Sequence, residues 1–167
     1  HKSSMTKRII SIDPGYERLG VAILEKDSRG QITLLHSECF KTLAKLDFVS
    51  RLVLIGDCVQ KNITEYNPST LAIENLFLST NQKTAMRVAE TRGAILYIAK
   101  KAQLSIHELT PLQIKSSLTG NGRSDKTAVE KMIKIILPHL KKETLKIDDE
   151  YDAIACGLSY FALEKSL

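Results

Sequence analysis

Three β-strand patterns precede the first helical pattern in this chain, and this order strongly constrains the fold. Apolar residues dominate segments 8–13, 19–25 and 32–37. Pro14-Gly15 and the Asp-Ser-Arg-Gly segment at 27–30 supply the turns between them. Strands joined by turns this short pair antiparallel with their neighbours. The sequence therefore predicts that the first three strands form a meander within one sheet.

Helical and strand-like patterns alternate in the rest of the chain. Apolar residues recur at helical spacing over 43–66, 84–101, a short segment that begins at Pro111, 125–137 and 149–163, and short apolar strands occupy 70–74 and 104–109. Ser124 is the expected N-cap of the fourth helix. This order predicts an α/β fold with a five-stranded mixed sheet, a β-meander followed by alternating helices and strands, and helices on both faces. The first strand lies centrally in such a sheet and neighbours the fourth.

The 167 residues contain no repeat, linker or low-complexity tract, so we expect a single domain over residues 5–167. Residues 1–4 precede Met5 and are interpreted as an expression remnant. No apolar stretch has the length of a membrane span, and no secretory signal pattern is present. The three cysteines are isolated from one another, which favours reduced thiols and a cytoplasmic protein.

Acidic residues stand where three of the predicted elements begin or end. Asp13 ends the first strand, Glu74 ends the fourth, and Asp149 and Asp152 open the last helix. The first and fourth strands are neighbours in the predicted sheet, so their carboxylates project from the same end. Converging carboxylates need a cation, and oxygen ligands of this kind favour Mg²⁺, with Mn²⁺ as a substitute. The pattern indicates a metal-dependent phosphodiesterase.

Each of these acids also has an ordinary structural interpretation. An aspartate before Pro-Gly, such as Asp13, is a common turn residue, and Glu74 fits a rim position paired with a lysine or arginine. Acids in a first helical turn, such as Asp149, are stabilised by the helix dipole. That effect explains Asp152 poorly, because an almost wholly apolar run follows it. Asp148 stays open as a ligand in place of Asp149, which we favour.

Basic residues dominate the segments between these acids, and the formal net charge is +5. Lys115 lies in the third predicted helix, and Lys126 follows a glycine-containing loop that also carries Arg123. The backbone N–H groups of such a loop and these side chains can hold a phosphate, which favours a DNA-binding role. Solvated surface residues are the plain alternative. Phe77 follows Glu74 closely and is interpreted either as a core anchor or as a wedge against an unstacked base.

Six short motifs occur in one order along the chain. They are Ile12-Asp13-Pro14-Gly15 with Gly20, Ala72-Ile73-Glu74 with Phe77, Ala89-Glu90-Thr91-Arg92-Gly93, Glu108 with Pro111 and Lys115, Gly120 with Gly122 and Lys126, and Asp149 with Asp152-Ala153-Ile154-Ala155. In this order and spacing the chain resembles the bacterial RuvC family of Holliday-junction resolvases, from Arg8 to about Phe161. The resemblance implies an RNase H-like fold.

The same resemblance implies a structure-selective endodeoxyribonuclease that resolves four-way DNA junctions during recombination and repair. It implies a homodimer that makes symmetric nicks, two Mg²⁺ ions per site, and work beside a branch-migration motor complex. By position, the implied catalytic and metal-binding residues are Asp13, Glu74, Asp149 and Asp152. Lys115 and Lys126 match the family's DNA-binding lysines, and Phe77 matches an aromatic residue that contacts the junction.

The sequence departs from the family pattern at a few positions and leaves alternatives open. Glu90-Thr91 and Leu109 stand where the family usually has other residues. These changes bear on the base preference and on the dimer contact. The helix over 84–101 is our candidate for that contact, and a core-facing helix is the alternative. An RNase H-like nuclease that acts on RNA or on other branched nucleic acids would carry the same acids. A catalytically silent nucleic-acid-binding module is the third possibility.

Overall fold

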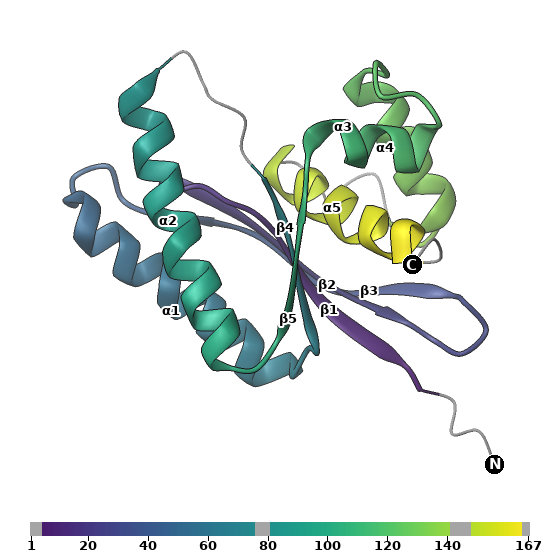
Figure 1. The fold of residues 1–167 in the computed structure, drawn as a ribbon, viewed down its shortest axis with the longest axis horizontal. Coiled ribbons are helices and arrows are strands. Elements are labelled where there is room, and N and C mark those ends of the chain that lie inside the picture. Colours follow the sequence, from purple (N-terminus) through teal and green to yellow (C-terminus); the bar gives the residue numbers. More distant parts are fainter. Residues whose placement is uncertain (1–4, 76–80, 141–147, 165–167) are drawn as a thin grey trace.

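The structure is a computed structural model in which residues 5–75, 81–140 and 148–164 are described. A twisted sheet runs through the middle of the molecule, and helices flank it on both sides (Figure 1). The strands are β1 (Lys7–Asp13), β2 (Arg18–Lys26), β3 (Ile32–Lys41), β4 (Thr70–Glu74) and β5 (Ser105–Leu109). The helices are α1 (Phe48–Tyr66), α2 (Gln82–Lys101), α3 (Pro111–Thr119), α4 (Lys126–Ile136) and α5 (Asp148–Glu164).

The strand order β3-β2-β1-β4-β5 confirms the predicted mixed sheet. β1, β2 and β3 pair antiparallel as a meander, whereas β4 pairs parallel with β1 and β5 pairs parallel with β4. Parallel neighbours need a crossover connection, and the segments that contain α1 and α2 supply it. β1 therefore lies in the centre of the sheet, and its carboxyl end lies beside that of β4.

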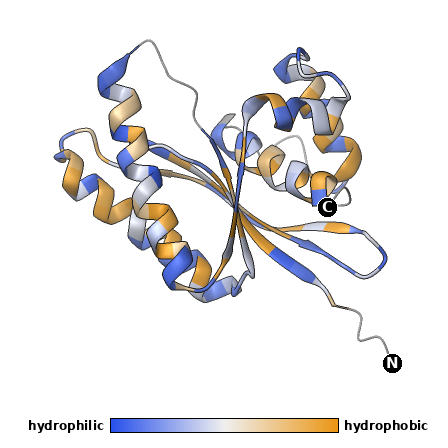
Figure 2. Cartoon of the chain, in the orientation of Figure 1, coloured by the Kyte–Doolittle hydropathy of each residue, from blue (hydrophilic) through white to orange (hydrophobic). Residues whose placement is uncertain are grey.

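Alternation along β1 sends its side chains into two separate cores. Ile10 and Ile12 pack with α1 and α2, whereas Ile9 packs with α5 on the opposite face, and all three are fully buried. α3 and α4 contribute to the α5 side, so helices cover both faces as predicted. Figure 2 shows hydrophobic residues in the strands and in the helices of both layers, interspersed with hydrophilic ones.

Close packing positions α5 against the sheet. The hydroxyl of Ser11 on β1 donates a 2.7 Å hydrogen bond to the carbonyl oxygen of Ala153. A Cβ at Gly157 would lie 2.2 Å from Leu24 Cδ1, so a larger residue there would push the helix away. The first turn of α5 is consequently held at the carboxyl end of β1.

Some element boundaries differ from the sequence prediction because capping residues set them. The first helix begins at Phe48 and not at residue 43, since the Asp47 side chain accepts a hydrogen bond from Ser50 N and caps it. The cap of α4 is Asp125, which accepts from Ala128 N, whereas the predicted cap Ser124 is hydrogen-bonded to Thr119. None of the described helices is long and apolar enough to cross a membrane.

Candidate active site

The register of β1 and β4 places two of the predicted acids side by side. Ile12 is paired with Ile73, and the next residues of the two strands are Asp13 and Glu74. Both side chains are on the sheet face that packs against α5, because each lies two residues from a side chain in that layer. The expectation that these carboxylates project from adjacent strands at one end is confirmed in this geometry.

The first turn of α5 brings two more carboxylates to the same place. Asp149 and Asp152 are three residues apart on the helix and therefore lie on one of its faces. Single carboxylate oxygens of Asp13, Asp149 and Asp152 all lie within 4.8 Å of one another. Gly20 makes this approach possible, because a Cβ there would lie 2.1 Å from the Asp149 carbonyl oxygen. Glu74 joins the group through a hydrogen bond with Asp13.

Burial and mutual repulsion disturb the ionisation of these acids. Desolvation, followed by the charges of the other three carboxylates, raises the pKa of Asp13 to about 8. Desolvation, followed by the charge of Asp152, raises the pKa of Glu74, while a hydrogen bond with Asp13 acts in the opposite direction. Acids that oppose one another's ionisation are stabilised by a cation. Since every donor is a hard carboxylate oxygen, the residues fit a divalent metal ion of the Mg²⁺ or Mn²⁺ kind.

Two predicted basic residues border this acidic group. Lys115 of α3 and Lys126 of α4 line a hollow of about 210 Å³ together with Glu74 and Asp152. Lys126 Nζ lies 3.6 Å from Asp152 Oδ1. Their positive charges act to lower the pKa of Glu74. Positive charge therefore lies directly beside the carboxylates, as a phosphate-binding role requires.

The described part of the structure does not bring three other residues considered in the sequence to this group. Arg123 is exposed in the loop before α4, where its backbone N–H donates to Asn121 Oδ1, and no contact of its side chain with the carboxylates is present. Phe77 lies outside the described residues. Asp148 opens α5, but its side chain is outside the described part of the chain, so the choice between Asp148 and Asp149 rests on the observed approach of Asp149.

Two neighbours of Asp149 were not identified from the sequence. Arg18 Nε lies 3.8 Å from Asp149 Oδ2, and Cys39 Sγ donates a hydrogen bond to the same oxygen at 3.7 Å. Burial, followed by the negative charge of Asp149, raises the pKa of the Cys39 thiol. The available signal was spacing, because Arg18 is two residues from Gly20 and hence shares its face of β2.

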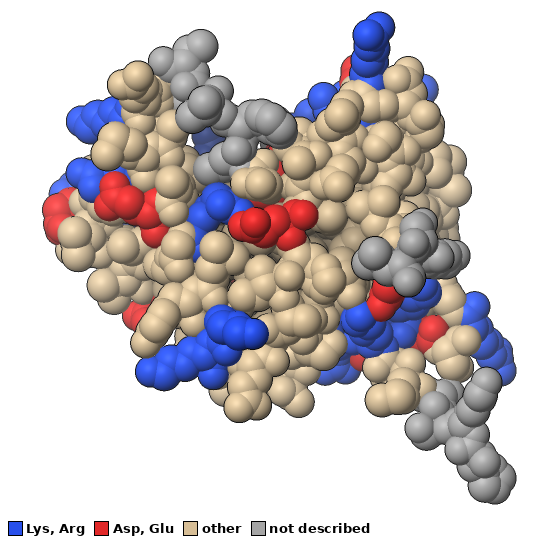
Figure 3. All heavy atoms as spheres, viewed as in Figure 1, with Lys and Arg blue, Asp and Glu red and all other residues tan. Residues whose placement is uncertain are grey.

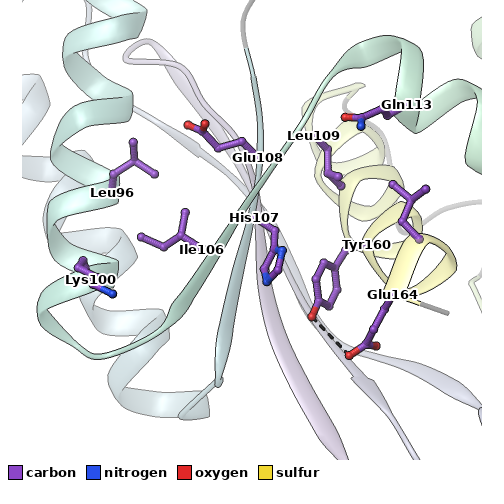
Figure 4. A pocket seen from close by; sticks show the side chains of 10 residues that line it. Leu96, Lys100, Ile106, His107, Glu108, Leu109, Gln113, Tyr160 and Glu164 are labelled. Carbon is purple, nitrogen blue, oxygen red and sulfur yellow. Dashed lines mark hydrogen bonds between the residues drawn. The ribbon is translucent and has the colours of Figure 1, made fainter. Parts of the chain in front are cut away.

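A much larger hollow lies away from the carboxylates. It has a volume of about 880 Å³ and follows the free edge of β5. Leu96 and Lys100 of α2 line one side of it, and Tyr160 and Glu164 of α5 lie on the other side (Figure 4). None of the four clustered carboxylates lines it. Cavity size therefore does not locate the candidate site in this fold.

The strand order, the two helical layers and the placement of the acids together define an RNase H-like protein with a candidate divalent-metal site. The family model of the crossover junction endodeoxyribonuclease RuvC matches residues 9–160. The chain belongs to the RuvC family, and this confirms the resemblance noted in the motifs.

Individual relatives agree with this assignment. RuvC of Thermosipho melanesiensis is 42% identical over 148 residues, covering 89% of this chain and 92% of the relative. RuvC of Halothermothrix orenii is 37% identical over 152 residues, covering 91% of this chain and 90% of the relative. The solved structure of Thermus thermophilus RuvC has a TM-score of 0.86 at 27% identity and covers 97% of this chain and 96% of that one. The same protein in complex with a Holliday junction substrate has a TM-score of 0.87 at 27% identity, with 96% of each chain covered.

Proposed function

We propose that this protein is a structure-selective endodeoxyribonuclease that resolves four-way DNA junctions during recombination and repair. The observation that carries the proposal is the convergence of Asp13, Glu74, Asp149 and Asp152 at one end of the sheet in a chain of the RuvC family. T. thermophilus RuvC has the same fold, and its structure in complex with a Holliday junction substrate supports the choice of DNA.

The proposed reaction is hydrolysis of one phosphodiester bond per active site. The four carboxylates would hold Mg²⁺, for which Mn²⁺ is expected to substitute. Bound divalent cations supply an activated water and stabilise the charge on the leaving 3′ oxygen. Lys115 and Lys126 line the hollow shared with Glu74 and Asp152, and in this proposal they position the DNA phosphate by their charge.

Symmetric cleavage of a four-way junction needs two active sites, so we propose a homodimer. α2 is the candidate contact, because Met86 and Tyr97 on this helix are each 65% exposed. A Cβ at Gly93 between them would meet nothing within 4 Å, which leaves room for a close neighbour. We also propose a cytoplasmic protein that works beside a branch-migration motor, consistent with the three free thiols.

The decisive experiment compares a mobile four-way junction, a linear duplex and an RNA–DNA hybrid as substrates. Each is incubated with Mg²⁺, Mn²⁺ or EDTA, and the cut positions are mapped on every strand. We expect paired, symmetric nicks in the junction alone, with both metals and not with EDTA. Cleavage of the hybrid would favour an RNA-directed nuclease instead. Tight binding without cleavage in either metal would mean that the module is catalytically silent.

Substitution of the two lysines tests their proposed phosphate contacts. We expect Lys115→Ala and Lys126→Ala each to weaken junction binding or slow cleavage, and each to reduce the slope of log affinity against log salt by about 1. The matched control is Lys61→Ala, exposed on α1, which packs on the opposite face of the sheet from α5. A slope that stays at the wild-type value in both lysine variants would contradict the phosphate contacts.

A further inference from the structure

Two cations face each other across the β2–β3 ladder beside the carboxylates. Arg18 and Lys41 are directly opposed residues in this antiparallel pair. Directly opposed side chains point to the same face of a sheet, and like charges in such positions destabilise it. An anion that contacts both cations would offset this repulsion.

A second pair of opposed cations in the sheet shows the usual solution. Lys7 and Lys26 are cross-strand partners in β1 and β2. Lys7 forms an ion pair with Glu164, and Lys26 lies over the ring of Phe161. Each of these cations thus has a protein partner that offsets the repulsion.

Among the described residues, the pair beside the active site lacks an equivalent set of partners. Arg18 has one ion-pair contact, the 3.8 Å approach to Asp149, and its side chain is 59% exposed. Within the part of the chain that the structure describes, Lys41 forms no ion pair. The adjacent Glu17 is 3.9 Å from Arg51, which provides it with a different counterion. Two exposed positive charges thus remain next to a carboxylate that is a candidate metal ligand.

Both cations lie on the face of the sheet that carries the candidate site, because Arg18 is two residues from Gly20 and Lys41 is two residues from Cys39. Their positive charges oppose the rise in the pKa of Cys39, whose thiol contacts Asp149. A hollow of about 280 Å³ is lined by Arg18, Asp13, Asp149 and Thr84. The hollow with Lys115 and Lys126 is lined by the other two acids, Glu74 and Asp152. Two hollows therefore border the carboxylate group, and each of them is lined by basic side chains of its own.

We propose that Arg18 and Lys41 form a second phosphate-binding subsite for the DNA backbone, on the side of the carboxylates opposite to Lys115 and Lys126. A nucleic acid strand carries a phosphate at every nucleotide and continues past the scissile bond in both directions. The inference rests on the proposed function and deepens it. The guanidinium of Arg18 carries several N–H donors, so it can approach Asp149 through Nε and still offer its exposed terminal nitrogens to a DNA phosphate. On the face shown in Figure 3, basic side chains form several separate groups with acids beside them. Overall charge therefore does not mark a single DNA path on this face.

The test measures binding without cleavage. A fluorescent four-way junction is titrated with wild type, Arg18→Gln, Lys41→Gln and the double variant in EDTA, over a series of salt concentrations. We expect the double variant to lose roughly tenfold in affinity at low salt, and its salt slope to fall by about 2. The control is Arg29→Gln combined with Lys61→Gln, which removes the same charge at the other end of β2 and on α1. The inference is wrong if the double variant keeps the wild-type slope, or if the control loses as much.

A second readout separates DNA contact from mere support of Asp149. Binding of Mn²⁺ to the protein alone is measured by titration calorimetry, without DNA. Arg18→Gln removes a cation that competes for Asp149, so we expect Mn²⁺ affinity to stay equal or to rise by about two- to fivefold. A clear loss of Mn²⁺ affinity would overturn the proposal, because Arg18 would then position Asp149. Failure of the proposed function can be told apart from failure of this inference, because the wild-type protein would then bind a four-way junction no more tightly than a linear duplex.

Discussion

Replacement of Asp152 by asparagine is expected to reduce junction cleavage by roughly a thousandfold or more and to leave junction binding nearly unchanged. The substitution keeps the size of the side chain but removes the charge that a divalent cation requires. It also removes one negative charge from a site that must accept a phosphate, so it gives no electrostatic reason for weaker binding. Glu74→Gln is expected to behave in the same way. Cleavage rates at saturating metal and binding in EDTA are the two measurements.

The matched control for this prediction is Asp57→Asn. Asp57 is exposed on α1, which lies on the opposite face of the sheet from α5, so its loss changes the net charge equally without touching the site. The control should cleave at the wild-type rate. If a folded Asp152→Asn protein lost binding and cleavage to the same extent, its carboxylate would act in DNA binding or structure and not in catalysis.

Much of the fold could be predicted because it depends on local pattern and chain connectivity. Short apolar runs bounded by turn residues identified β1 and β2, short turns required antiparallel pairing, and the helical segment before β4 required a crossover. Those three facts place Asp13 beside Glu74 before any distance is known. Helix starts were less predictable, because Ser124 and Asp125 are equally good caps for α4 in sequence. In the structure Ser124 is hydrogen-bonded to Thr119, and Asp125 caps the helix.

Lys41 and Cys39, the β3 residues opposite Arg18 and Gly20, could not be predicted for a specific reason, a register shift in the β2–β3 ladder. Counted from the turn, Lys26 pairs with Ile32, and an uninterrupted ladder would place Arg18 opposite Phe40. The register shifts between Ile23 and Leu24, so that Arg18 faces Lys41 instead. A one-residue shift moves every later side chain of a strand to the other face, and no turn or hydrophobic pattern marks this one in the sequence. The positions of Lys41 and Cys39 thereby became visible only in the structure, whereas the face of Arg18 follows from its spacing to Gly20.

The second large effect concerns the pH dependence of the metal-free protein. The pKa of Asp13 is raised to about 8 from an ordinary value of 3.8, chiefly by desolvation and the charge of Glu74. Between these two values the folded state holds a proton that the unfolded state has released. The free energy of unfolding must then decrease as pH rises through this interval. Below the ordinary value both states are protonated, and the effect vanishes.

Asp13→Asn is expected to remove this loss of stability, since asparagine stays neutral at every pH. Urea unfolding in EDTA should show the variant gaining about 3 kcal/mol relative to wild type between pH 5.5 and pH 8, at 1.36 kcal/mol per pH unit. Mg²⁺ should restore much of the wild-type stability at pH 8, because a cation replaces the missing proton, and should do less for the variant. A constant difference between the two proteins across this pH range would contradict the raised pKa. If the variant gains this stability and also loses cleavage, the carboxylate of Asp13 is kept for chemistry at the expense of the stability of the fold.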